Sequence, residues 1–237
     1  MKPDVRNILL DIEGTTTPID FVYQVLFPFA RRRTGDYLKI HWSADDVQHD
    51  VVRLREENAA DAQQGLNPPQ LEPTVESVTG YIYCLMDRDR KSTPLKSLQG
   101  KIWQEGYESG ELLSQVFDDV PPALHRWRQH GKRIYIYSSG SVLAQKLLFG
   151  HTTFGDLTPL LSGYFDTTVG AKQEAASYRR IAASIQQSPE TILFVSDVVA
   201  ELNAASAAGF QCALSLRAGN SPQPANLFPS INNFDEL

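Results

Sequence analysis

The feature that most constrains this chain is an alternation of short apolar runs with amphipathic segments of helix length. The first run, Val-Arg-Asn-Ile-Leu-Leu at residues 5–10, ends abruptly at Asp11, and similar β-branched or aromatic runs recur at 133–137, 191–195 and 211–215. Runs of this length predict buried strands, and the helical segments between them predict crossover connections. The sequence therefore predicts an α/β fold with a Rossmann-like parallel sheet.

A long helical insertion separates the first predicted strand from the second. It holds about a hundred residues, far more than one crossover helix requires. Ser43, just before an Ala-Asp-Asp run, resembles the start of a capping box, and Ser92 lies two residues before a proline in a first helical turn. We therefore predict an all-helical subdomain at residues 20–113, inserted into an α/β core of residues 1–19 and 114–237.

Composition and charge exclude some classes of partner. Lys and Arg total 22 against 28 Asp and Glu, a net charge of −6, which opposes the counterion-release attraction that drives nucleic-acid binding. The N-terminal residues Met1–Asp4 lead directly into a strand-like run, and no stretch near 20 apolar residues follows. We expect a cytoplasmic monomer without nucleic-acid or membrane partners.

Cys84 and Cys212 lack metal-site spacing and are expected to be reduced.

Two carboxylates leave the first predicted strand together. Asp11 and Glu13 precede Gly14, and a tight turn at this glycine would bring both acids to one pocket. A carboxylate at a strand end can attack phosphorus, and a second acid can protonate the leaving group and then deprotonate water. The alternative is an ordinary turn with two solvated acids.

A hydroxyl-rich segment follows the second predicted strand. Ser138, Ser139, Gly140 and Ser141 precede a predicted helix, whose N-terminal N–H groups favour an anion. The segment is either a phosphate cradle or an ordinary helix N-cap.

Further charged residues follow the later strands. Asp197 lies two residues after the third apolar run, and Glu201 lies four residues further on, on the same face of a helix that begins near Val198. With Asp11 these acids suit Mg²⁺, which prefers oxygen ligands; Asp197 would otherwise only cap the helix. Lys172 is a point charge that could neutralise both a phosphate and the nucleophile.

In chain order, Asp11-x-Glu13-Gly-Thr, Ser138, Lys172 and Asp197 resemble the four motifs of the haloacid dehalogenase superfamily of aspartate-nucleophile phosphotransferases. More narrowly, four stretches are similar to the enolase-phosphatase family of methionine salvage: residues 10–19, 136–141, 144–151 and 165–172. The superfamily usually has Asp at the position of Glu13 and often a pair of acids where this chain has Ser196-Asp197. Both departures agree with the narrower family.

The resemblance implies a substrate and a set of roles. The substrate would be 2,3-diketo-5-methylthiopentyl-1-phosphate, enolised and then dephosphorylated to an acireductone in one site with one Mg²⁺ per chain. Asp11 would be nucleophile and metal ligand, Glu13 a metal-associated acid/base, and Asp197 a metal ligand. Ser138, Ser139 and Lys172 would bind the substrate phosphate. Because Glu is one methylene longer than Asp, we hypothesise that Glu13 also reaches the carbon-bound proton removed in enolisation.

The helical insertion would then be a cap. We hypothesise that it selects the methylthio tail by closing over it and excluding water. Its aromatic and methionine side chains would line an apolar pocket or form its own small core: Tyr81, Tyr83, Met86, Trp103 and Tyr107.

Other functions stay open. A related phosphatase could act on another small ester such as a sugar phosphate. A dehalogenase needs neither a metal nor an acid at position 13, and a silent phosphate-sensing module needs no aspartate nucleophile. Substrate profiling and Mg²⁺ dependence separate these possibilities.

Overall fold

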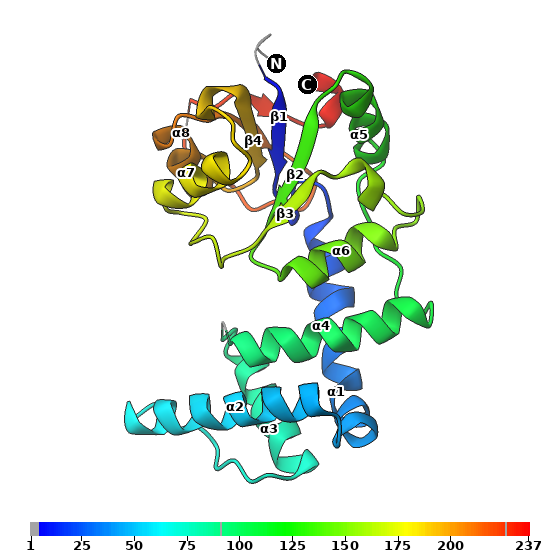
Figure 1. Ribbon diagram of the computed structural model, residues 1–237, viewed down its shortest axis with the longest axis vertical. Coiled ribbons are helices and arrows are strands. Elements are labelled where there is room, and N and C mark those ends of the chain that lie inside the picture. The colour runs from blue at the N-terminus through cyan, green and yellow to red at the C-terminus, as the bar shows by residue number, and fades with distance from the viewer. Residues whose placement is uncertain (1–4, 91, 226) are drawn as a thin grey trace. The chain divides into compact units, whose positions relative to one another are not determined.

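The computed structural model describes residues 5–90, 92–225 and 227–237, and within them six strands form one parallel sheet (Figure 1). The strands are β1 (Asn7–Leu10), β2 (Arg133–Tyr137), β3 (Gly163–Phe165), β4 (Ile192–Ser196), β5 (Gln211–Ser215) and β6 (Ser230–Ile231). Their order is β3-β2-β1-β4-β5-β6, a doubly wound order whose direction reverses between β1 and β4. The predicted α/β core is confirmed. Residues 1–4, which lead into the first predicted strand, lie outside the described residues.

The register of β1 with its neighbours determines which residues meet at the carboxyl edge of the sheet. Leu10 pairs with Ile136 of β2 on one side and with Val195 of β4 on the other. The N–H of Asp11 continues the ladder by donating to the Val195 carbonyl at 3.0 Å. The segments after β1, β2 and β4 therefore leave the sheet side by side at its reversal point, where sheets of this kind bind ligands.

Helices cover the sheet on both faces. In Figure 1, α7 (Ala175–Ser184) and α8 (Val199–Ala207) lie together on one side and α5 (Val120–Gln129) on the other, while α6 (Val142–Gly150) follows β2. Short 3₁₀ turns complete the unit: η2 (Thr158–Leu160), η3 (Pro189–Thr191) and η4 (Phe234–Glu236). No helix among the described residues is both long and apolar enough to cross a lipid bilayer.

The core between the sheet and α7 is centred on the fully buried ring of Tyr178. This ring forms edge-to-face pairs with three other aromatic rings, with centroid distances of 5.6 Å to Tyr137, 5.1 Å to Phe194 and 5.6 Å to Phe210. Edge-to-face pairs of this kind are favourable beyond the apolar area that they bury. The cluster ties β2, β4 and α7 together directly below the carboxyl edge of the sheet.

The chain divides into two compact units, Met1–Gln24 with Leu113–Leu237, and Val25–Leu112. The second unit contains α1 (Phe27–His41), α2 (Asp45–Gln63), α3 (Val75–Asp87) and α4 (Thr93–Glu108), and a π-helix, η1 (Phe21–Leu26), leads into α1. The helical insertion predicted at residues 20–113 thus corresponds in position to a unit bounded by Val25 and Leu112.

Of the two helix caps predicted in this second unit, the structure confirms one. Ser92 caps α4, because its hydroxyl accepts the Leu95 N–H at 3.3 Å. The capping box predicted at Ser43 is wrong. Because α2 begins only at Asp45, its N-cap residue is Ala44, which has no side chain able to accept the hydrogen bond.

Large side chains of the insertion form the core of this unit. Tyr81, Trp103 and Tyr107 are buried, and the Trp103 indole N–H donates to the Leu26 carbonyl at 2.9 Å. The Tyr83 hydroxyl donates to the Arg31 carbonyl at 3.1 Å. These contacts match the alternative in which the aromatic residues stabilise the insertion itself.

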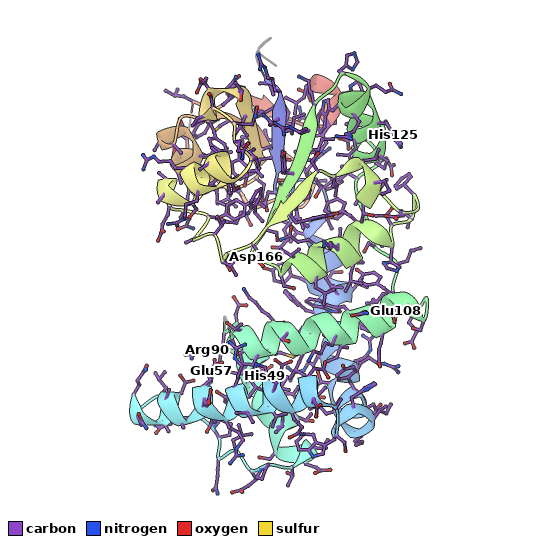
Figure 2. All side chains as sticks on the ribbon, viewed as in Figure 1. His49, Glu57, Arg90, Glu108, His125 and Asp166 are labelled. Carbon is purple, nitrogen blue, oxygen red and sulfur yellow. The ribbon has the colours of Figure 1, made fainter. Side chains whose placement is uncertain are left out.

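A polar cluster joins α2 to the segment before α4. Arg90 lies 2.8 Å from Asp61 and 3.8 Å from Glu57, and Figure 2 labels Arg90 and Glu57.

Candidate active site

The turn after β1 is held by hydrogen bonds that converge on one carbonyl. The Ile12 oxygen accepts the N–H groups of Thr15, Thr16 and Thr17 at 3.2, 2.9 and 2.9 Å, and the Gly14 N–H donates to the Thr17 carbonyl at 2.8 Å. Gly14 adopts a φ of +67°, a left-handed conformation that glycine accepts without steric cost. The chain therefore reverses directly after Asp11. Glu13 is half-buried within this turn, where it forms a parallel bridge with Thr17.

Asp11 is the buried centre of the site, with 4% of its surface exposed. Its Oδ1 accepts the Ile12 N–H at 2.8 Å and the Lys172 ammonium at 2.5 Å. Its Oδ2 accepts the Ser196 hydroxyl at 3.3 Å. The structure thus brings together Asp11 and Lys172, two predicted site residues that are 161 positions apart in the chain.

The aromatic core positions the loop that carries Lys172. The Tyr178 hydroxyl donates to the Lys172 carbonyl at 2.7 Å, and the Tyr137 hydroxyl donates to the Gly170 carbonyl at 2.8 Å. Gly170 has a φ of +130°, and a Cβ at this position would lie 2.2 Å from the Ser177 hydroxyl oxygen. The backbone on which Lys172 stands is therefore fixed by buried rings rather than by the loop alone.

Glu201 provides a second carboxylate for Lys172. Its Oε2 lies 2.7 Å from the Lys172 ammonium and accepts the Ser196 hydroxyl at 2.9 Å. Burial alone would lower the pKa of Lys172, but the charges of Asp11 and Glu201 outweigh burial and raise it. Lys172 therefore stays positively charged between the two acids. From the sequence, Glu201 is grouped with the acids that suit a metal ion. No motif predicts its ion pair with Lys172.

Asp197 follows β4 and is also buried. Burial, together with the charges of Asp11 and Glu201, raises the pKa of Asp197 to about 7, and burial with the charge of Asp11 raises that of Glu201 to about 7. Such crowding of carboxylates favours a cation among them. A Cβ at Gly14 would lie 2.6 Å from Asp197 Oδ2 and 2.7 Å from the amide oxygen of Asn220, so both oxygens pack against this glycine and leave no room for a side chain.

The donor set fits Mg²⁺ better than an ion that needs a full protein cage. In the part of the chain that the structure describes, no group of three or more His, Cys, Asp or Glu side chains is arranged to hold a metal. Mg²⁺ retains several waters and is commonly bound by one or two carboxylates plus substrate phosphate. Asp11 and Asp197, which directly follow the neighbouring strands β1 and β4, satisfy that requirement.

The serine segment is closer to an ordinary helix cap than to an open phosphate cradle. Ser141 is the N-cap of α6 and accepts the Ala144 N–H at 3.2 Å. The Val142 N–H donates to the carboxylate of Asp166 at 3.3 Å; Figure 2 labels Asp166 after β3. Ser138 is buried, and its hydroxyl oxygen accepts the Gly140 N–H at 3.1 Å, while Ser139 is exposed. Phosphate binding by this segment would depend on its hydroxyl groups more than on the helix end.

Gln145 fixes the serine segment, although nothing in the sequence marked it out. Only 1% of its surface is exposed, and its amide NH₂ donates to the Gly140 carbonyl at 2.9 Å and to the Phe165 carbonyl at 2.8 Å. The Phe165 carbonyl also accepts the Ser138 N–H at 3.1 Å. One side chain thereby joins the loops that follow β2 and β3.

Comparisons with known proteins agree with this geometry. The sequence model of haloacid dehalogenase-like hydrolases matches residues 5–209. The enolase-phosphatase E1 of Synechococcus elongatus is 54% identical over 233 residues, which cover 98% of both chains. A Vitis vinifera protein described as a probable bifunctional methylthioribulose-1-phosphate dehydratase/enolase-phosphatase E1 is 46% identical over 246 residues, covering 100% of this chain and 48% of that protein. The crystal structure of the UTR4 protein of Saccharomyces cerevisiae is similar, with a TM-score of 0.81 and 34% identity over 98% of this chain and 100% of that one.

Proposed function

We propose the activity of this chain from one premise: it belongs to the haloacid dehalogenase-like hydrolases and, within them, to the enolase-phosphatase E1 family. It converts 2,3-diketo-5-methylthiopentyl-1-phosphate, through the enol, into the acireductone 1,2-dihydroxy-3-keto-5-methylthiopentene and phosphate, in methionine salvage. The Vitis vinifera relative supports this substrate, because its name joins the enolase-phosphatase to a methylthioribulose-1-phosphate dehydratase, and loss of water from that sugar phosphate yields the diketone.

The observation that carries the proposal is the 2.5 Å contact between Asp11 and Lys172 at the reversal point of the sheet. A buried carboxylate held in this way is a fixed nucleophile for phosphorus. Asp11 attacks the phosphoryl group, the bond from phosphorus to the substrate oxygen breaks, and Glu13 gives that oxygen its proton. Glu13 then deprotonates a water that attacks the aspartyl-phosphate, which frees phosphate and restores Asp11.

Lys172 binds the phosphoryl oxygens, together with the hydroxyls of Ser138 and Ser139. When Asp11 becomes an acyl phosphate, it loses the charge that paired with Lys172. Glu201, 2.7 Å from the same ammonium, keeps Lys172 charged and in position at that stage. The ammonium therefore stabilises the charge that develops on the phosphoryl group through both steps.

Enolisation precedes dephosphorylation in the same site. A proton leaves the carbon that bears the phosphate ester and the neighbouring carbonyl oxygen takes up a proton, so that the carbonyl becomes an enol. We assign the removal of this carbon-bound proton to Glu13, whose side chain is one methylene longer than the aspartate usual in the superfamily. The half-buried position of Glu13 in the turn after Asp11 supports this assignment.

Asp11, Glu13 and Asp197 would hold one Mg²⁺. When bound, the ion would polarise phosphoryl and carbonyl oxygens and offset the charge of the carboxylates. The close packing of Asp197 against Gly14 and the raised pKa of Asp197 support this placement. The Val25–Leu112 unit would serve as the cap that selects the methylthio tail, and the enzyme would act as a cytoplasmic monomer.

The test is one assay with two readouts. Phosphate release from the diketone phosphate is measured with and without Mg²⁺, while ultraviolet absorbance follows the enol and the acireductone. The proposal predicts metal-dependent release preceded by an enol signal, and weaker release from simple phosphate esters. Release from sugar phosphates alone would retain the Asp11 chemistry and refute the substrate, and no release from any ester would refute the enzyme.

A further inference from the structure

Asn220 reaches the catalytic turn from the loop that follows β5. The chain turns back after β5 through Arg217–Asn220, with the Asn220 N–H donating to the Arg217 carbonyl at 3.2 Å and Gly219 at a φ of +90°. The Asn220 side-chain NH₂ then donates to the Gly14 carbonyl at 3.0 Å and to the Ser215 carbonyl at 3.1 Å. This loop is therefore tied directly to the turn that follows the nucleophile.

The two hydrogen bonds fix the orientation of the amide. Both acceptors are backbone carbonyls, so they require the NH₂ end of Asn220, and Oδ1 must point away from them. This oxygen is buried and has no hydrogen-bond partner within residues 5–90, 92–225 and 227–237. Buried acceptors in native proteins are normally satisfied, so an unpaired one indicates a missing donor.

The unpaired oxygen packs against Gly14 beside the Asp197 carboxylate. A Cβ on Gly14 would lie 2.7 Å from Asn220 Oδ1 and 2.6 Å from Asp197 Oδ2. An amide oxygen and a metal-binding carboxylate oxygen are both acceptors, so they cannot satisfy each other. A donor that reaches both oxygens would satisfy both.

We infer that Asn220 is a positioning residue of the metal site: its amide oxygen accepts a hydrogen bond from the hydration shell of the Mg²⁺ that Asp197 holds. Groups that contact metal ligands from outside commonly change metal affinity by about 10- to 100-fold when they are replaced. The inference rests on the proposed function, because that function supplies the metal. It adds a residue from the loop after β5 to a site otherwise built from the loops after β1 and β4.

A simpler role has to be separated from this one, since Asn220 also clamps the Gly14 backbone. Ser215 provides the control, because its hydroxyl donates to the same Gly14 carbonyl at 3.1 Å. Ser215→Ala removes one clamp on that carbonyl and leaves the amide oxygen of Asn220 in place. Asn220→Asp removes both donated bonds and retains an acceptor oxygen, whereas Asn220→Leu removes donors and acceptor at similar size.

The experiment is calorimetric titration of each folded protein with Mg²⁺ alone, without substrate, supported by electron paramagnetic resonance with Mn²⁺. We expect Asn220→Leu to raise the Mg²⁺ dissociation constant by about 10- to 100-fold, Asn220→Asp to recover most of this loss, and Ser215→Ala to change it by less than about twofold.

Two outcomes would overturn the inference alone. The first is wild-type affinity in Asn220→Leu, and the second is an equal loss in Ser215→Ala, which would assign the effect to the Gly14 backbone. A wild-type protein that binds no Mg²⁺ would instead overturn the metal requirement of the proposed function, and the inference with it.

Discussion

Replacing Gly14 by alanine tests the geometry of the site most sharply. The new Cβ would lie 2.6 Å from Asp197 Oδ2, whereas ordinary contact begins at about 3.4 Å, so the carboxylate must retreat by roughly 0.8 Å. A misplacement of about 1 Å at a reacting centre can cost about 10²-fold in rate. The left-handed backbone, at a φ of +67°, adds a stability cost of about 1–2 kcal/mol. We therefore expect kcat/KM to fall about 100-fold and Mg²⁺ affinity to fall with it.

Gly131 provides the matched control in the same unit. It has a φ of +71°, and a Cβ there would meet no atom within 4 Å, so Gly131→Ala introduces the backbone strain without the clash. Both variants should lose about 1–2 kcal/mol of unfolding free energy in urea, and only Gly14→Ala should lose activity and metal affinity. Equal activity in the two variants would show that the packing of Asp197 against Gly14 is not needed for the metal site.

Three further substitutions test separate parts of the account. Glu13→Gln should slow the appearance of the enol absorbance by at least about 10²-fold, because it removes the proposed base; unchanged enolisation would show that another group removes the proton. Gln145→Leu should weaken inhibition by inorganic phosphate about tenfold, since two hydrogen bonds that hold the serine segment are lost, while Mg²⁺ affinity stays constant; unaltered phosphate inhibition would count against that support. Asp119→Ala should cost about 3–5 kcal/mol in urea unfolding, because it leaves the Arg217 guanidinium, 5% exposed and paired through two 2.8 Å bonds, without its partner. A loss below about 1 kcal/mol would show that Arg217 finds another partner or reaches water.

The central strands were predictable because burial on both faces imposes continuous apolar runs. β1, β2 and β4 each present such a run, and the polar residues directly after them mark the carboxyl edge. Two edge strands were missed: β3 has three residues and β6 has two, which is too short for any periodicity to appear. Ser230, at the start of β6, pairs with Leu214, and this pairing is a tertiary contact.

The site was predictable to the extent that its residues follow strands. Asp11 and Lys172 were named from sequence, and the structure brings them together. Glu201 was also noted, but its partner was not, because the ion pair with Lys172 depends on how α8 packs beside the loop after β3. Gln145 and Asn220 are uncharged amides, which are common on surfaces and in loops, so only the fold reveals what they contact.

The most direct test of the account is to look for the phosphoryl group on Asp11 itself. Wild-type enzyme is mixed with the diketone phosphate and Mg²⁺, quenched in acid within a turnover, digested and examined by mass spectrometry, with Asp11→Asn treated in parallel. The account predicts a phosphorylated peptide containing Asp11 that disappears during a chase, and no phosphate release by Asp11→Asn. Turnover without that peptide, or phosphate release by Asp11→Asn at the wild-type rate, would contradict it.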